Sequence, residues 1–171
     1  MFKPAIAVVA LACAVLFAGL GFAVASGQGG SAGRSIVVAD DDGGVLATVP
    51  LAGDSFAVSY RNSIYQTLAE ERYEVQADGS YRLVQIAADQ LAVLEEYYGV
   101  PGAPQEAPKD DRRNWVVPPD PEHPAVFTKL SIAATDLGER TLHVPGAEPV
   151  QLWQLVEDGD PYITIEIKEN Q

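Results

Sequence analysis

The chain has 171 residues and a strong excess of acid, with 24 Asp and Glu against 11 Lys and Arg and a formal net charge of −13. Because binding to phosphate backbones relies on Lys and Arg, this balance argues against nucleic acid as a partner. The single cysteine, Cys13, lies in an apolar stretch near the N-terminus. Disulfides, thiolate metal sites and a cysteine nucleophile are therefore excluded for the rest of the chain.

Residues 1–25 have the layout of an export signal. Lys3 is the only charged residue before Arg34, and an apolar run extends from Ala5 to Ala25. The small residues Ala23 and Ala25 predict cleavage after Ala25. The run also approaches the roughly 20 residues that cross a bilayer, so an uncleaved N-terminal membrane anchor is the alternative. Either way we expect an extracytoplasmic protein, secreted or tethered, that contacts the membrane only through this segment.

The sequence from residue 26 onwards predicts a linker followed by one domain. Residues 26–34 are rich in Gly and Ser, which favours a flexible linker. Residues 35–171 show short β-branched and aromatic runs separated by Asp, Gly and Pro, which is typical of an all-β, mostly antiparallel domain. We expect about eight to ten strands, a number that favours a single sandwich or small barrel.

The first strands are expected at 35–39 and 45–50. Asp40-Asp-Asp-Gly-Gly44 lies between them and predicts a hairpin turn, because its glycines can adopt positive φ. A calcium loop is the alternative interpretation of the three aspartates. The alternating Asp spacing and distant Glu of such a loop are missing.

The next elements are a strand at 56–61 and a hairpin formed by 70–77 and 81–88. Phe56, Val58 and Tyr60 alternate with small or polar residues, so the strand is expected to bury them on one face. With Asp78 and Gly79 as the central turn residues, the predicted register places Val75 opposite Arg82, Tyr73 opposite Val84 and Glu71 opposite Ile86. Tyr73, Val75, Val84 and Ile86 would then share a face.

The middle of the chain is less regular. Residues 90–98 carry apolar side chains at helical spacing and predict a short helix or an irregular cover. Residues 101–124 contain seven of the twelve prolines, which cannot donate to a sheet ladder, so we expect a surface loop. Within it, Arg112 and Arg113 beside Trp115 can pair with the neighbouring acids or receive a ligand carboxylate.

The C-terminal part returns to strand character at 125–134, 141–144, 150–155 and 162–168. Ile163, Ile165 and Ile167 alternate strictly with polar neighbours, which is the pattern of a half-buried antiparallel strand.

Four residues are candidates for a ligand site: Tyr60, Asn62, Ser63 and Glu71. Continuing the alternation of the 56–61 strand places Asn62 on the inward face and Ser63 on the outward one, and Glu71 is inward in its own strand. An amide and a carboxylate at neighbouring strand ends can form the floor of a binding site. The alternative is a structural hydrogen-bond pair that satisfies buried polar groups.

Catalytic and cofactor motifs are missing. His123 and His143 have no second histidine at metal-ligand spacing, and no serine has the glycine-flanked setting of a nucleophile elbow. We therefore expect no metal, no cofactor and no enzyme activity.

The segment Tyr60-Arg-Asn-Ser-Ile-Tyr-Gln-Thr-Leu-Ala-Glu-Glu-Arg-Tyr-Glu-Val75 resembles the signature of domain-of-unknown-function family 1850. That family is exported, and its members tend to be encoded beside TRAP transporters of the TAXI type. Tyr60, Ser63, Glu71 and Tyr73 fit the motif, and the similarity covers most of residues 35–168. Asn62 departs from it, because the family has histidine there. Without that titratable group, binding is favoured over acid–base catalysis.

The resemblance implies a transport-associated exported domain. The favoured hypothesis is a non-enzymatic accessory or binding module whose partner is the TRAP transporter's membrane subunit, its solute-binding protein or a small solute. The second hypothesis is an extracytoplasmic hydrolase with Glu71 as general base.

Overall fold

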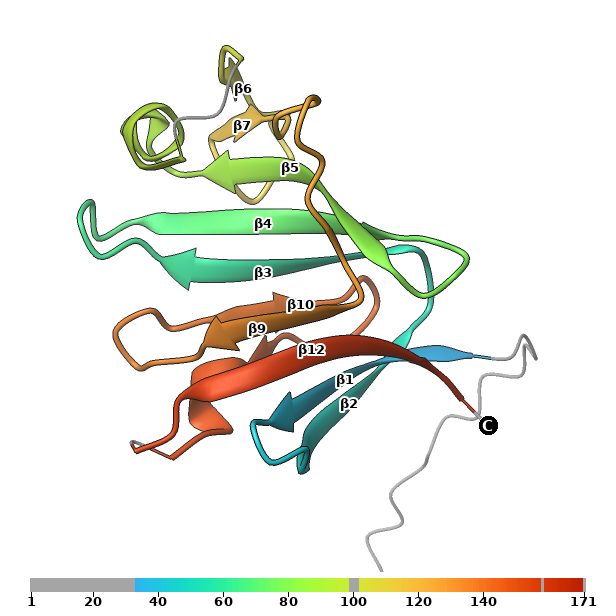
Figure 1. Cartoon of the computed structure of the whole chain (residues 1–171). Coiled ribbons are helices and arrows are strands. Elements are labelled where there is room, and N and C mark those ends of the chain that lie inside the picture. Colours follow the sequence, from blue (N-terminus) through green and yellow to red (C-terminus); the bar gives the residue numbers. More distant parts are fainter. Residues whose placement is uncertain (1–32, 99–101, 158, 171) are drawn as a thin grey trace, which may run out of the picture.

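The computed structural model describes residues 33–98, 102–157 and 159–170, which form two antiparallel sheets (Figure 1). The predicted export segment, and all of the predicted linker except Gly33 and Arg34, lie outside the described residues. In the part of the chain that is described, no helix has both the length and the apolar character to cross a membrane. The all-β class is confirmed, and the two separate sheets are arranged like a sandwich.

The smaller sheet has the order β2-β1-β12-β9. Its strands are β1 (Arg34–Asp40), β2 (Val45–Leu51), β9 (Lys129–Ala133) and β12 (Tyr162–Glu169). The predicted first hairpin is confirmed: β1 pairs with β2, and Gly43 has φ +84° in the turn. The Asp40 carboxylate accepts the Gly44 N–H at 2.6 Å, so it closes the turn. The C-terminal strand is also confirmed, with Ile163 and Ile165 fully buried.

The larger sheet has the order β11-β10-β3-β4-β5-β7-β6, with β8 pairing β5 off this path. Its strands are β3 (Ser55–Arg61), β4 (Leu68–Val75), β5 (Tyr81–Ala88), β6 (Gln105–Glu106), β7 (Trp115–Val117), β8 (Val126–Phe127), β10 (Thr141–His143) and β11 (Val150–Gln151). The predicted alternation in β3 is confirmed, because Phe56, Val58 and Tyr60 are buried. Ala57 and Ser59 are buried as well, so both faces of β3 are covered.

The main core lies between the two sheets. We call the face of the larger sheet that meets the smaller sheet its inner face, and the opposite face its outer face. Phe56 and Tyr73 stack on the inner face with ring centroids 5.0 Å apart, and Tyr81 packs edge-on against both. The Tyr81 hydroxyl donates to the carbonyl oxygen of Ile165 at 2.7 Å, which ties the sheets together.

The β4–β5 hairpin forms as predicted, but its register differs. Val75 lies opposite Tyr81 and Tyr73 opposite Leu83, whereas Glu71 is opposite Ile86 as expected. The turn has three residues, 77–79, with Gly79 at φ +82°, rather than the two assumed. A β-bulge then restores the register, because Arg72 pairs with Gln85 and leaves Val84 as the extra residue. Val84 therefore does not join Tyr73 and Val75 on the inner face.

The predicted helical segment is a π-helix, η1 (Val93–Tyr98). Val93 and Leu94 are fully buried and form a second cluster with Tyr60, Ile86 and other residues. The proline-rich segment carries β6 and β7, and β7 pairs with β5.

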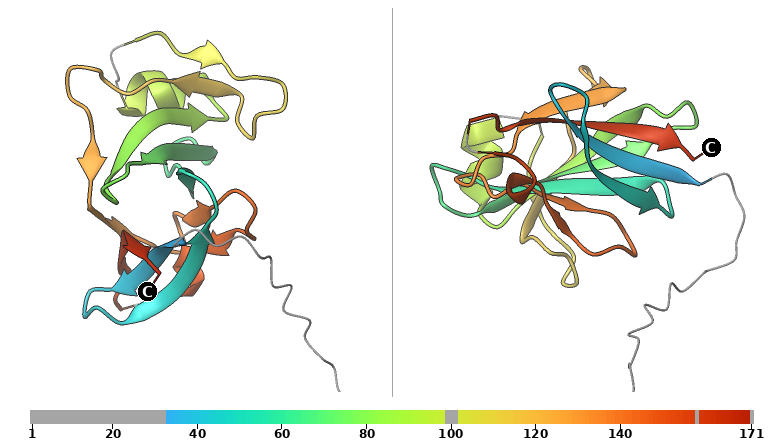
Figure 2. Two further views of the ribbon diagram at one scale, coloured as in Figure 1. Left: turned by 90° about the vertical axis from the view of Figure 1, so that its right-hand side faces the viewer. Right: turned by 90° about the horizontal axis from the view of Figure 1, so that it is seen from below.

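Residues 125–134, predicted as one strand, change sheets. β8 pairs with β5 in the larger sheet, whereas β9 pairs with β12 in the smaller one. The connection from β7 to β9 runs from one sheet to the other, orange in Figure 2. Near the C-terminus, η2 (Leu152–Gln154) is a short 3₁₀ helix. The described residues hold twelve strands, more than the eight to ten expected, because pieces of two or three residues leave no periodic pattern.

Candidate functional site

The side chain of Asn62 stabilises the turn that follows β3. Its Oδ1 accepts the backbone N–H groups of Ile64 and Tyr65, each at 3.0 Å, and the residue is only 1% exposed. Its own N–H donates to the Thr67 carbonyl oxygen at 2.8 Å. A buried amide used in this way satisfies the backbone of the loop between β3 and β4.

Glu71 and Tyr60 belong to a network of tyrosine hydroxyls on the inner face. Tyr73 donates to Glu71 Oε2 at 2.7 Å and Tyr98 donates to Glu71 Oε1 at 2.9 Å. Tyr60 donates to the Tyr98 hydroxyl at 2.8 Å. Burial raises the pKa values of Tyr73 and Tyr98, so these groups stay protonated donors. Both oxygens of the Glu71 carboxylate are therefore engaged.

Ser63 is exposed and lies at the end of β3. Together with Tyr60 and Asn62 it lines a hollow of about 230 Å³, which also includes Arg61 and Arg140. Glu71 does not line this hollow. The structure thus brings three of the four predicted residues to one small surface hollow and places the fourth in the tyrosine network.

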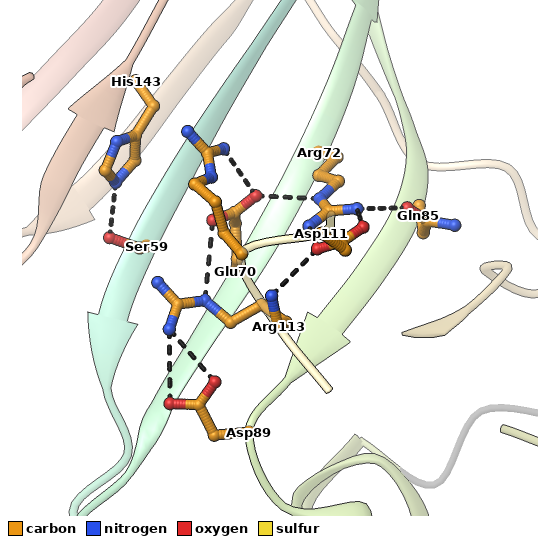
Figure 3. Close-up of polar contacts among 9 residues, drawn as sticks. Ser59, Glu70, Arg72, Gln85, Asp89, Asp111, Arg113 and His143 are labelled. Carbon is orange, nitrogen blue, oxygen red and sulfur yellow. Dashed lines mark hydrogen bonds and ion pairs between the residues drawn. The ribbon is translucent and has the colours of Figure 1, made fainter. Parts of the chain in front are cut away.

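A cluster of arginines surrounds Glu70 on the outer face (Figure 3). The Glu70 side chain is fully buried. Arg72 Nε and Arg112 Nη2 each donate to its Oε1 at 2.8 Å, and Arg113 Nε lies 3.7 Å from its Oε2. Because successive side chains of a strand point to opposite faces, Glu70 and Arg72 share the face that Glu71 does not. We call Glu70, Arg72, Arg112 and Arg113 the arginine cluster.

Two aspartates and a glutamine extend the arginine cluster. Asp111 binds Arg72 through both carboxylate oxygens, at 2.8 and 2.6 Å. Gln85 Oε1 accepts from Arg72 Nη1 at 2.7 Å, and Asp89 accepts from Arg113 Nη1 at 3.1 Å. The segment before β7 is thus fixed to the sheet by its arginines. The prediction that Arg112 and Arg113 pair with neighbouring acids is wrong, because their side chains pair with Glu70 and Asp89, which lie 42 and 24 positions away.

Electrostatics favour the ionised carboxylates of the cluster. Burial opposes ionisation of Glu70, but hydrogen bonds from Arg112 and Arg72 outweigh it and hold the pKa of Glu70 below its ordinary value. The hydrogen bond from Arg72 likewise lowers the pKa of Asp111.

Ser59 and His143 form a polar pair on the same face. Ser59 Oγ lies 2.8 Å from His143 Nε2, across the β3–β10 ladder (Figure 3). Burial, followed by the charge of Arg112, lowers the pKa of His143, so the ring is neutral near pH 7. No carboxylate among the described residues accepts a hydrogen bond from the ring, so the third member of a catalytic triad is missing there.

A groove of about 560 Å³ lies beside the arginine cluster. Its polar lining residues are Ser55, Arg72, Gln85, Arg112 and His143, and the lining also includes apolar residues and Gly146. The apolar residues are Phe56, Ala57, Tyr73, Val84, Val144, Pro145, Ala147 and Pro149. The volume is in the range of small-molecule sites, which are mostly apolar with a few convergent polar groups. We call this hollow the groove.

Sequence reasoning missed most of the groove. The sequence indicates that Arg112 can receive a carboxylate, but it does not show that Arg112 lies near Arg72, Gln85 or His143. One signal was present: Glu70 and Arg72 alternate with the predicted inward residues of β4, so two charges were placed side by side on the opposite face. The bulge that brings both Val84 and Gln85 into the groove lining has no recognisable signal in the sequence.

Comparison with models of protein families, with curated proteins and with solved structures found no match to this chain.

Proposed function

We propose that the chain is a non-enzymatic binding module that accommodates a small organic solute in the groove. The supporting observation is the groove itself, where apolar residues of the 144–149 turn and of β5 meet polar groups from four separate segments. Arg72 comes from β4, Gln85 from β5, Arg112 from the segment between β6 and β7, and His143 from β10. Such convergence on one hollow is typical of ligand sites.

The alternative, a hydrolase with Glu71 as general base, has less support. Both Glu71 oxygens accept tyrosine hydroxyls, and Glu71 lines neither the groove nor the hollow at Ser63. Ser59 and His143 form the closest nucleophile–base pair, but Ser59 is 5% exposed and does not line the groove. A general base needs a reachable proton on its substrate.

The partner we propose is a TRAP-type transporter, through its membrane subunit or its solute-binding protein. This part rests on the resemblance of Tyr60–Val75 to the exported family, together with the export signal read from residues 1–25. In this proposal the domain is extracytoplasmic, and the solute held in the groove is one that the transporter handles.

Solute binding is tested by NMR titration of the full chain with small organic acids, alcohols and amides. We expect saturable shifts of backbone signals at Val84, Gln85 and Ala147. Ile64 and Leu137 lie away from the groove and serve as internal references. Shifts confined to the reference positions, or none with any compound, would refute the binding function.

The partnership is tested separately by chemical crosslinking on cells followed by purification of the tagged chain. Recovery of a TRAP membrane subunit or solute-binding protein is expected. Recovery of neither, when an abundant exported control protein is crosslinked normally, would count against the transporter association.

A further inference from the structure

The groove differs from the rest of the molecule in its charge. The chain carries 24 acidic and 11 basic residues, yet none of the residues that line the groove is Asp or Glu. Two arginines and a histidine line it instead. His143 is neutral near pH 7, so Arg72 and Arg112 carry the charge of this lining, and the Glu70 and Asp111 carboxylates that pair with them lie outside it. The surface of the groove therefore favours an anion over a cation or a basic partner.

The two arginines differ in how many donors they have left. Arg72 has one N–H left, because Nε binds Glu70, Nη1 binds Gln85 and Asp111, and Nη2 binds Asp111 through one of its two hydrogens. Among the described residues Arg112 donates one hydrogen bond, from Nη2 to Glu70, and its side chain is 50% exposed. A guanidinium has five N–H donors in a planar fork that matches a carboxylate. Arg112 is therefore the cation with more donors left to receive a ligand carboxylate.

Gln85 supplies a second donor. Its Oε1 accepts a hydrogen bond from Arg72. The amide nitrogen Nε2 is therefore the atom that remains as a donor. That Nε2 has no hydrogen-bond partner among the described residues. A neutral donor in the same groove as Arg112 supports binding of an oxyanion without adding charge.

The remaining lining is apolar. Val84, Val144 and Ala147 are half-buried or buried, and Pro145 and Pro149 stand exposed in the turn between β10 and β11. A small inorganic anion would leave this surface unused, whereas a molecule with an apolar body would cover it and gain roughly 25 cal/mol for each Å² of apolar surface removed from water.

We propose that the groove binds an organic monocarboxylate with an apolar body, its carboxylate paired with Arg112 and its body against Val84 and the 144–149 turn. This ligand class rests on the proposed binding function. Arg112 keeps its bond to Glu70 when the ligand is bound, because separate N–H groups serve the two carboxylates.

The test uses titration calorimetry near neutral pH to measure the affinity of the full chain for butyrate, octanoate and phenylbutyrate. The amide of each acid is measured in the same way for comparison. Acid and amide have the same shape and differ in charge. We expect at least one acid to bind, about tenfold or more tighter than its amide, because hydrogen bonds to charged groups are the stronger ones. Amides that bind as tightly as acids would overturn the ligand class but leave the binding function standing. Binding of neither set would overturn both.

A pair of variants locates the carboxylate. Arg112→Gln removes the proposed anchor. Arg82→Gln is the matched control, since Arg82 is 48% exposed, forms one ion pair with Glu74 and does not line the groove. We expect Arg112→Gln to lower acid affinity roughly tenfold and to leave amide affinity nearly unchanged, with no effect of Arg82→Gln on either. Equal losses for acid and amide would refute the assignment, and if Arg112→Gln does not fold, the acid–amide comparison on the unaltered chain decides.

Discussion

Glu70 Oε2 and Arg113 Nε lie 3.7 Å apart inside the arginine cluster, and both atoms are buried without a hydrogen-bond partner among the described residues. They face each other just beyond hydrogen-bonding range. The attraction of their charges partly offsets the cost of desolvating both groups. Glu70 is thus shared by all three guanidinium groups, in addition to the pairs that Arg72 and Arg113 form with Asp111 and Asp89.

Replacing Glu70 is expected to destabilise the fold strongly. Glu70→Gln keeps the shape but leaves Arg72, Arg112 and Arg113 without their shared counter-charge, which typically costs about 3–5 kcal/mol for a buried pair. Chemical denaturation measures the change in unfolding free energy. Glu74→Gln is the control on the same strand, because Glu74 is half exposed and a surface pair contributes about 0–1 kcal/mol. Similar losses for both variants would contradict the central role of Glu70.

Acid should weaken the same cluster. The pKa values of Glu70 and Asp111 are lowered in the folded state, so their contribution to stability is fully present above the ordinary carboxyl values of 4.5 and 3.8. It is lost as the pH falls through the lowered folded-state values. The difference in unfolding free energy between the unaltered chain and Glu70→Gln should therefore be constant near neutral pH and should decrease below about pH 4.5. Urea denaturation at a series of pH values measures it, and a gap that widens in acid would contradict the prediction.

An acidic side chain in the groove should discriminate between charged and neutral ligands. Val84→Glu introduces a carboxylate where none lines the groove. It should lower affinity for the carboxylate probes by about tenfold or more, because like charges repel in a partly buried site. Val84→Gln is the isosteric neutral control and should leave the acid–amide preference intact. The prediction would be wrong if calorimetry showed that both variants lower the affinity for the carboxylate probes equally.

Replacing the neighbours Asn62 and Ser63 should affect the stability of the fold to very different extents. Asn62→Ala removes the acceptor of two backbone N–H groups in a buried turn and is expected to cost about 1–3 kcal/mol of unfolding free energy. Ser63→Ala should change stability by less than about 0.5 kcal/mol, because the side chain is exposed and has no hydrogen bond among the described residues. Thermal denaturation checks both. Neither variant should alter solute affinity in the groove, and a selective loss of affinity in Asn62→Ala would restore Asn62 as a ligand residue.

The fold class could be predicted because strand alternation and turn glycines are local signals. The alternation of Phe56, Val58 and Tyr60 and that of Ile163 and Ile165 both identified buried side chains correctly, although the other face of β3 is buried as well. The register of the β4–β5 hairpin could not be predicted in full. It depends on a three-residue turn closed by Gly79 and on a bulge at Val84, and the two deviations cancel by the time Glu71 meets Ile86.

The groove could not be predicted for a different reason. Its polar residues are distant in sequence, and Arg112 meets Glu70 across 42 positions. Such pairings arise from strand order, which alternation does not specify. Asn62 and Glu71 could be recognised as inward-facing polar residues, but the groups that satisfy them depend on a turn and on tyrosines contributed by two elements.

The place of β12 in the smaller sheet sets an order of assembly. This strand lies between β1 and β9 and pairs with both, so the two cannot be joined before it arrives (Figure 1). The β1–β2 hairpin and the β3–β4–β5 meander pair residues that are close in sequence. The centre of the smaller sheet, and with it the Tyr81–Ile165 bond between the layers, depends instead on residues 162–169, which are distant in sequence from β1. A chain in which β12 is unpaired would therefore leave the inner aromatic face of the larger sheet without the strand that packs on it, and such exposed apolar surface favours aggregation.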